Sequence, residues 1–590
     1  MGEKSKRKSS GKDSSKAVKK TKTAVDTTGE ELSSSAQKRQ LKKERQSHRR
    51  HAETVTEAKS LWNKLRVKSN TPEDTKELME QVMTLIRGKV NEIALQHDAS
   101  RVVQAAIQFG NDEQRKELLK EICAESAAGL AELSKIQYAH FCCLKFIKYC
   151  ARDPECVKMM IKGFKGSIPK LAVHSVGSRV LESIFLNLPA KSTMTLKQEL
   201  YGPHFSLFVQ DIKSTPTLKS NLDSATSETQ KEAAIKFVKD ILSKGMSKSF
   251  FGYTYFQDLL AEFFEVADGD EIRTMASSIA DHSIHLLSTR TGTRVVAACA
   301  AYGSPKDRKR ICKSLKGYTT SSLLHKDAYL ALLRLVQVTD DTVSINKSVF
   351  NEILTAPKDE SNENASNPLL QLALSETGSK LFLMLLVEDD EARSKYFDPY
   401  ERSILEAVAM VRENGQDVPT SKKDPAARRQ ELVKFLESSL EELCTSHTME
   451  LLKSLPGSRV IKEFYNRTSS ETVSNAIIEA CESELENGDA DIFEDPVGHR
   501  TIKNLIQCDA NKENPVFGTA FFEKFAGRLT DVVKSNRGAF VVSTLLKVDS
   551  LSEKVATKLK SMKKRLQELS KGKGQTAGFE ALLKALSAKS

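Results

Sequence analysis

Apolar residues recur along the chain at the spacing of one helix face. In the stretch Gln96–Leu119 an apolar stripe at helical spacing predicts a buried helix side, followed by a turn and a second amphipathic helix. The stripe consists of Val102, Val103, Ala106 and Ile107. We expect Gly110 to end the first helix in a left-handed conformation. Asn111 can cap the second helix, with Gln114 as its reciprocal partner.

The same local pattern returns further along the chain, where Val295 and Val296 precede Y-G-S-P-K-D. Here we expect Ser304 to cap a helix, Pro305 to occupy its first turn and Asp307 to complete a capping box. Between about His51 and Leu65 a further helix is expected, which carries the chain's tryptophan, Trp62.

A five-residue motif marks one helix of each unit. S-R-V-V-Q at Ser100–Gln104 is repeated as Ser178–Glu182, Thr293–Ala297 and Ser458–Lys462. Consecutive copies are 78, 115 and 165 residues apart, which are close to whole multiples of 38–41 residues. A weaker copy, His140-Phe141, lies 40 residues after Ser100. A persistent period of this length with helical patterning predicts an α-solenoid.

The polar members of the motif have no place in a core. Ser100 and Gln104 are four residues apart and share a helix face, with Arg101 at its edge. Equivalent helices of a solenoid lie side by side, so we expect these residues to form a strip that faces a ligand. Arginine planes can stack on bases and short polar side chains can contact base edges, so single-stranded RNA fits such a strip.

Composition and charge narrow the class of protein. A chain of 590 residues is too long for one compact core. Its 39% hydrophobic and 6% aromatic content favours a soluble, mostly helical protein. Its ten cysteines lack a C-x-x-C pair and indicate reduced thiols inside a cell. The longest apolar run, Leu381–Val387, is too short to cross a bilayer.

Most of the net charge of +12 lies at the N-terminus. Residues 1–50 contain 16 Lys+Arg and 6 Asp+Glu, a net of +10, which leaves +2 for the other 540 residues. We expect residues 1–50 to be a disordered basic tail. It is either a nuclear or nucleolar targeting segment that also touches nucleic acid, or a solvated run of charge. If the folded part binds a polyanion, it must use a local basic face.

The repeated motif resembles the pumilio-homology (PUF) repeat, in which a three-residue set with this spacing reads one base. Further stretches resemble the divergent Puf-A family, whose C-terminal half carries a CPL segment. These stretches are Tyr302–Lys309, Thr339–Thr342, Ser421–Leu432, Asn536–Ala539 and Gly578–Leu583. The resemblance covers roughly residues 60–590.

The resemblance implies an all-α, right-handed solenoid of about eleven PUF-like repeats, bent into two lobes in an L shape. It also implies a monomeric nucleolar protein of large-subunit ribosome biogenesis, in contact with pre-rRNA and pre-ribosomal proteins. Family members of this kind would bind structured RNA, and also DNA, through basic surfaces with little sequence preference. We expect no membrane association, cofactor, metal or catalytic site.

The departures from the base-reading pattern agree with weak sequence preference. By the PUF code, Ser100/Gln104 would prefer adenine and Ser178/Glu182 guanine, but no other unit has a reading pair. A cation, in contrast, recurs at the second motif position, and phosphate contacts carry affinity without sequence information. The recurring cations are Arg101, Arg179, Arg294, Lys380, Arg459 and Arg500. Further candidates for nucleic-acid contact are Lys145, Lys148, Lys306, Arg308 and Lys309.

Three alternatives remain open from the sequence. Each arginine could be a structural cation that pairs with an acid of a neighbouring repeat, and Arg179 has Glu182 close by on its own helix. The whole chain could be a HEAT- or armadillo-like protein scaffold, which predicts absent or salt-insensitive RNA binding. It could also be a sequence-specific mRNA repressor, which predicts one motif bound far better than its point variants.

The expected domain organisation follows from polar interruptions. After the tail we expect about three N-terminal repeats over residues 51–213 and a polar insertion over residues 214–232, where the array may bend. The C-terminal repeats, with the CPL segment, then occupy residues 233–590. Residues 357–368 and 414–425 are expected to be loops.

Overall fold

The structure is a computed structural model that describes residues 51–125, 129–207, 215–355, 367–487, 492–510, 516–571 and 576–588. The predicted basic tail and most of the predicted loop at residues 357–368 lie outside these ranges. The contacts divide the chain into two compact units. Unit 1 comprises Met1–Ser167 and Asn187–Ser192, and unit 2 comprises Ile168–Leu186 and Thr193–Ser590.

Unit 1 is built from short helices that alternate with tight turns. Its helices are α2 (Ala52–Leu65), α3 (Pro72–Ile86), α4 (Val90–Ala94), α5 (Ser100–Phe109), α6 (Asp112–Glu125), α7 (Gly129–Lys135), α8 (His140–Cys150) and α9 (Pro154–Phe164). Trp62 lies in α2, as predicted.

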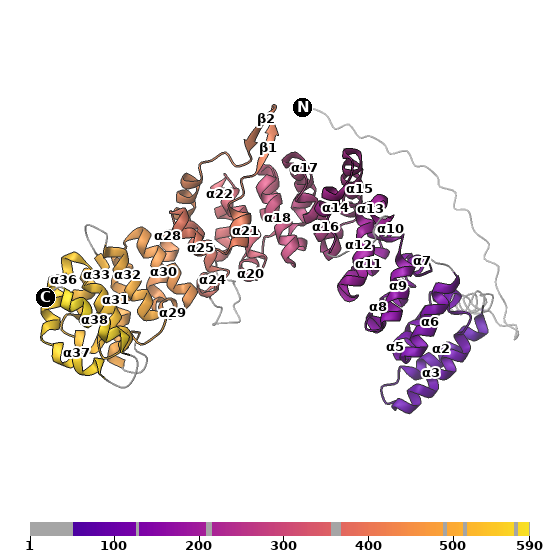
Figure 1. Ribbon diagram of the computed structural model, residues 1–590, viewed down its shortest axis with the longest axis horizontal. Helices are drawn as coiled ribbons and strands as arrows, with labels where there is room; N and C mark the ends of the chain where they lie inside the picture. The colour runs from indigo at the N-terminus through magenta and orange to yellow at the C-terminus, as the bar shows by residue number, and fades with distance from the viewer. Residues whose placement is uncertain are drawn as a thin grey trace, which may run out of the picture. The chain divides into compact units, whose positions relative to one another are not determined.

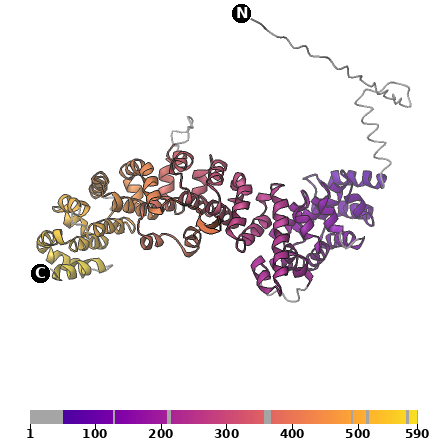
Figure 2. The same ribbon diagram turned by 90° about the horizontal axis from the view of Figure 1, so that it is seen from above.

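Unit 2 continues the same alternation, and Figures 1 and 2 show its helices following one another in a row. Its first half contains α10 (Ile168–Ala172), α11 (Gly177–Asn187), α12 (Ala190–Gln198), η1 (Glu199–Tyr201), α13 (Pro203–Leu207), α14 (Leu218–Ser224), α15 (Glu228–Met246), η2 (Phe250–Gly252), α16 (Thr254–Phe264), α17 (Gly269–Ile279), η3 (Ala280–Leu286), α18 (Arg290–Tyr302), α19 (Pro305–Ser314), α20 (Thr319–Leu324), α21 (Tyr329–Val338), α22 (Thr342–Ile345), η4 (Asn346–Phe350) and α23 (Asn351–Leu354).

The second half of unit 2 contains α24 (Pro368–Leu374), α25 (Ser379–Leu386), α26 (Asp390–Ser394), α27 (Pro399–Leu405), β1 (Met410–Glu413), β2 (Gln416–Pro419), α28 (Pro425–Ser446), α29 (Thr448–Lys453), α30 (Leu455–Thr468), α31 (Glu471–Asn487), α32 (Gly498–Ala510), α33 (Val516–Phe525), α34 (Leu529–Val532), α35 (Asn536–Leu545), α36 (Asp549–Lys560), α37 (Lys563–Ser570) and α38 (Ala577–Ala588). The fold is the predicted helical solenoid.

One helix of each repeat carries the five-residue motif or its equivalent, and we call these the motif helices. They are as numerous as the resemblance implied: α5, α8, α11, α16, α18, α21, α25, α30, α32, α35 and α38. Many successive pairs pack side by side, among them α5 with α8 and α18 with α21. The apolar motif residues Val102 and Val103 are buried, as expected.

Most motif helices begin with a side-chain cap that was not predicted from the sequence. A polar side chain accepts a hydrogen bond from the backbone N–H three residues later, as from Gly292 to Thr289 Oγ1 at 2.9 Å. The third residue is usually glycine because the preceding helix approaches closely: a Cβ on Gly378 would lie 2.8 Å from the Leu372 backbone. A polar residue that is followed by glycine three positions later is therefore a sequence signal for the start of a motif helix.

The predicted caps are partly confirmed. Asn111 and Gln114 form the reciprocal pair, at 2.8 and 3.0 Å, and the capping box of Ser304 and Asp307 is present. The prediction for Gly110 was wrong, since its φ of −63° is not left-handed. Glycine suits this position because a Cβ would lie 2.6 Å from the Ala106 carbonyl oxygen.

Two predicted interruptions contain regular structure. The polar insertion holds α14, and α15 begins inside it. The loop expected at residues 414–425 contains β2, which pairs antiparallel with β1 in the register Met410↔Pro419. Asn414 and Gly415 supply the two positive φ values of the hairpin turn. This hairpin lies against α17 (Figure 1) and is the exception to the helical structure of the residues that the structure describes.

Among the described residues, no single helix has both the length and the apolar character needed to cross a bilayer. By composition and length alone, α24 and α25 pass that test as a pair bent by 81°. Every side chain of α25 is buried in the repeat stack.

Candidate nucleic-acid interface

The motif helices α5 and α8 of unit 1 lie side by side, but the serine of the motif does not face outward. Ser100 is fully buried, and its hydroxyl donates to the His97 carbonyl oxygen at 3.3 Å. The Gln104 amide, which is half-buried, contacts Ser100 Oγ and the Tyr138 carbonyl oxygen, both at 3.4 Å. The expectation that Ser100 belongs to a ligand-facing strip was therefore wrong, because this position packs against the neighbouring repeat.

The second motif position does face outward. Arg101 is exposed on α5 and forms no ion pair with any residue that the structure describes. Phe141 holds the same position on α8 and is 40% exposed. Lys145 and Lys148 follow Phe141 on the same side of α8, four and seven residues on. We call Arg101, Phe141, Lys145 and Lys148 the open face.

The ring of Tyr149 gathers cations at the end of this face. The Lys148 and Lys145 ammonium groups lie 5.4 and 5.8 Å from its centroid, and the Arg115 guanidinium lies 5.3 Å away. Burial and the neighbouring Lys148 lower the pKa of Lys145. Cations beside aromatic rings are the side chains that hold nucleic-acid backbone and bases.

The motif helix α11 of unit 2 also has a buried serine at the first motif position and an exposed arginine at the second. Ser178 is fully buried, so it cannot read a base edge, while Arg179 is exposed and unpaired among the described residues. Glu182 accepts hydrogen bonds from the backbone N–H groups of Thr254 at 2.8 Å and Tyr255 at 3.2 Å. Its carboxylate therefore caps α16. Among the described residues, Glu182 forms no ion pair with Arg179, and its carboxylate is engaged by backbone N–H groups.

In the repeats of α18, α21 and α25, another segment of the chain lies across the face that carries the motif residues. We call residues 396–409, which include α27, the covering segment. Its Glu401 is buried and accepts hydrogen bonds from the Lys380 ammonium group and from the Tyr329 hydroxyl. Tyr400 lies under the Arg290 guanidinium, 3.7 Å from centroid to Cζ. The motif cation of α25 is thus a structural cation.

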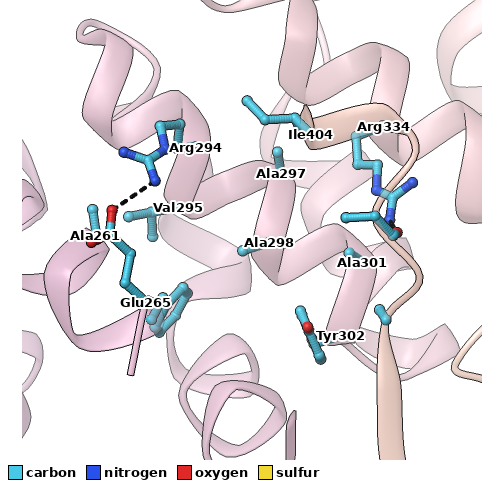
Figure 3. A pocket seen from close by; sticks show the side chains of 13 residues that line it. Ala261, Glu265, Arg294, Val295, Ala297, Ala298, Ala301, Tyr302, Arg334 and Ile404 are labelled. Atoms are coloured by element: carbon cyan, nitrogen blue, oxygen red, sulfur yellow. Dashed lines mark hydrogen bonds and ion pairs between the residues drawn. The ribbon is translucent and has the colours of Figure 1, made fainter. Parts of the chain in front are cut away.

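The covering segment also closes the motif face of α18 and α21. Arg334 of α21 donates to the carbonyl oxygens of Leu405, at 2.6 Å, and Ala407. Between these elements lies a cavity of about 160 Å³, lined by Ala297 at the fifth motif position and by Ile404. Figure 3 shows Arg294 on one side of this cavity, bound to Glu265 at 2.9 Å, and Arg334 on the other.

Two further motif cations, on α30 and α32, also differ in whether an acid pairs with them. Arg459 of α30 pairs with Glu376 of the preceding repeat at 2.9 Å, which is the structural role considered from the sequence. Arg500 of α32 is exposed and has no ion pair within the described ranges. Among the described residues, the motif cations without an ion pair are therefore Arg101, Arg179 and Arg500.

Of the basic cluster on α19, one member was wrongly predicted. Arg308 is 1% exposed and donates to the carbonyl oxygens of Ala300 at 2.8 Å and Ala301 at 3.0 Å, where it closes the end of α18. Arg115 and Arg393 close α5 and α25 in the same manner. The arginine lies four residues after the helix cap in all three cases, which is a signal that the sequence does contain. Lys306 and Lys309 are exposed and stay candidates.

Comparison with known families matches parts of this array. The Pumilio-family RNA binding repeat matches residues 89–123 and 167–199, and the CPL (NUC119) domain matches residues 374–515. The first two ranges hold Arg101 and Arg179, and the third holds the covering segment. The chain is 29% identical to human Pumilio homolog 3 over 93% of its own length and 82% of the relative's. It is 23% identical to Pumilio homology domain family member 6 of Saccharomyces cerevisiae, over 84% and 75%.

Solved structures show the same architecture. The crystal structure of human Puf-A is similar with a TM-score of 0.73 at 26% identity, over 90% of this chain and 99% of that one. Human Puf-A in complex with DNA gives the same TM-score at 27% identity, with the same coverage. The PUF repeats, the CPL domain and the likeness to Puf-A along nearly the whole fold agree with one another, and together they support a Puf-A family protein.

Proposed function

We propose that this protein holds structured RNA, and also DNA, through exposed cations with little preference for base sequence. Its place of action is large-subunit ribosome assembly in the nucleolus, in contact with pre-rRNA and pre-ribosomal proteins. The single observation that carries the binding proposal is the pair Arg101 and Arg179. Both are exposed and free of carboxylate partners among the described residues, and both lie in the repeats that match the RNA-binding family.

The weak sequence preference follows from the neighbours of these arginines. Base reading needs polar groups on both sides of the stacking residue, but Ser100 and Ser178 are buried and Glu182 caps a helix. What stays exposed is positive charge, which binds phosphate whatever the base. The complex of human Puf-A with DNA supports a mode of binding that does not depend on the ribose hydroxyl.

A salt titration tests this proposal. Binding of the full chain to two unrelated single strands and one hairpin of equal charge is measured by fluorescence anisotropy between 50 and 200 mM salt. We expect similar affinities and a steep common loss with salt. The variant Arg101→Glu/Arg179→Glu should bind about tenfold or more weakly, with a slope shallower by about two. Lys434→Glu, an exposed reversal on α28, is the matched control.

The other outcomes identify the competing functions. Binding that is absent or insensitive to salt would favour a protein scaffold. One strand preferred at least a hundredfold over its point variants would favour a sequence-specific mRNA repressor. Either result would overturn the proposal.

The nucleolar assignment rests on the basic tail and on the family. Residues 1–50 carry a net +10, the composition of targeting tails that also touch nucleic acid. A fluorescent fusion that lacks these residues should leave the nucleolus while its purified form keeps most of its RNA affinity. Mapping crosslinks in cells should place the protein on pre-rRNA. Crosslinks confined to mRNA would contradict the assignment.

A further inference from the structure

A second cavity lies inside unit 2, away from the exposed motif arginines. It has a volume of about 880 Å³, is open to solvent on one side and is lined mainly by α21, α25, the covering segment and the start of α28. Cavities of this size hold small organic ligands. Its walls are unusual in their charge, since five arginines and two lysines line it against three carboxylates. The arginines are Arg334, Arg393, Arg402, Arg428 and Arg429.

Some of these cations are neutralised by acids. Arg428 binds Asp340 at 2.7 Å and Lys422 binds Glu413 at 3.2 Å. The Arg393–Asp390 and Lys423–Glu431 pairs are also formed. These four pairs leave three arginines of the wall outside any ion pair, together with two wall carboxylates, Glu406 and Asp424.

Three arginines of the wall form no ion pair within the described ranges: Arg334, Arg402 and Arg429. Arg334 and Arg429 donate to backbone carbonyl oxygens, Arg429 to that of Glu388 at 3.0 Å. Carbonyl groups satisfy the N–H groups but carry no negative charge, and the nearby carboxylates of Asp390 and Glu388 compensate the charge of Arg429 only in part. The Nε atom of Arg402 is buried and has no hydrogen-bond partner at all, which is costly for a charged donor.

The surroundings make this charge unfavourable without a counter-ion. Burial, together with the nearby Arg308 and Arg428, lowers the pKa of Arg334 to about 10. Burial and the adjacent Arg393 lower the pKa of Arg429. Desolvated like charges raise the free energy of the folded protein unless an anion lies between them.

The smaller cavity beside α18 provides an internal contrast. It shares Arg334 but is otherwise lined mainly by alanines, and its second arginine, Arg294, is paired with Glu265. The clustering of several arginines outside any ion pair is therefore a feature of the larger cavity, whereas the smaller one has Arg334 alone.

We propose that the cavity between α21, α25, the covering segment and α28 binds a compact polyphosphate anion, held by Arg334, Arg402 and Arg429. Arginine forks match phosphate oxygens in pairs, and three arginines outside any ion pair can engage more than one phosphate group. The volume accommodates several linked phosphates. The shared chemistry is the polyphosphate group, which an inorganic chain, a nucleoside triphosphate or an inositol polyphosphate could supply.

Calorimetric titration of the full chain tests this proposal. The probes are inorganic tripolyphosphate, adenosine triphosphate and inositol hexakisphosphate, each at matched ionic strength. We expect at least one to bind at a single site per chain, and the one that binds best identifies the source. Arg402→Gln should weaken that binding about tenfold or more. Lys434→Gln, on the same helix as Arg429 but outside the cavity, should leave it within about twofold.

Two further measurements keep the result decisive. If Arg402→Gln alters the circular dichroism spectrum, Lys422→Gln replaces it, because this side chain is 69% exposed, and about a threefold loss is expected. RNA affinity is measured on the same samples and should not change by more than about twofold. Absence of binding by all three probes, equal binding by the variants, loss on Arg101→Glu, or stoichiometric displacement by RNA would each overturn the proposal.

Discussion

The open face of α5 and α8 and the motif face of α18, α21 and α25 have the same backbone plan and opposite surroundings. In unit 1, Arg101 and Phe141 extend from the second motif position into solvent. In unit 2 the same position of α25 carries Lys380, which is held by the buried Glu401 of the covering segment. The comparison teaches that a motif cation marks a place in the repeat, and its neighbours decide whether it is available to a polyanion.

The largest expected effect comes from removing the buried acid of the covering segment. Glu401→Ala leaves Lys380 buried without a counter-charge, so we expect a loss of about 3–5 kcal/mol in the stability of unit 2. The measurement is the denaturant midpoint followed by circular dichroism. Glu132→Ala, which breaks the exposed pair with Lys135 in unit 1, should cost less than about 0.5 kcal/mol.

A double variant separates charge burial from general disruption. Glu401→Gln/Lys380→Met removes both charges and should recover most of the stability lost in Glu401→Ala. If Glu401→Ala unfolds no more easily than the wild type, the covering segment does not hold this face closed and the comparison fails.

A smaller effect is expected for the aromatic residue of the open face. Phe141→Ala should weaken binding to single-stranded RNA by about 1–3 kcal/mol, because a stacking surface is lost, and should change stability by less than about 0.5 kcal/mol. Affinity for a duplex, whose bases are already stacked, should change less. Leu186→Ala, the truncation of a more exposed apolar side chain on α11, is the control. Equal losses for strand and duplex would argue against stacking.

The smallest expected effect comes from the motif serine of α5, which is buried instead of exposed. Ser100→Ala removes a buried hydroxyl that donates to the His97 carbonyl oxygen and accepts from the Gln104 amide on its own helix. RNA affinity should change by less than about twofold, and stability by about 1 kcal/mol or less. A large loss of affinity with unchanged stability would show that this serine does contact RNA.

Much of the fold could be predicted from the sequence, because helix periodicity, caps and the repeat period are local properties. The capping boxes at Asn111 and Ser304 and the burial of Val102 and Val103 follow from residues close in the chain. The hairpin of β1 and β2 was missed because its strands are only four residues long, too short for an alternating pattern to stand out.

The site was harder to predict, since availability depends on residues distant in sequence. Arg308 and Lys306 look alike in the sequence, but only Arg308 closes the end of α18 and is buried. The sequence around Lys380 does not indicate its partner, because Glu401 lies 21 residues later on a different helix. The sequence predicts outward-facing serines because Ser100 and Gln104 are four residues apart and so share a helix face. The packing of α5 on α8 instead directs that side into the repeat interface.

The most direct test compares Arg101→Gln with Arg294→Gln. Both arginines occupy the second motif position, but Arg101 is unpaired within the described ranges, whereas Arg294 binds Glu265 beside the covered cavity. Anisotropy titrations with one structured RNA, at several salt concentrations, report both affinity and slope. We predict that Arg101→Gln weakens binding about three- to tenfold and makes the salt slope shallower by about one, while Arg294→Gln stays within about twofold. Equal losses for the two variants, or a loss only for Arg294→Gln, would contradict the account.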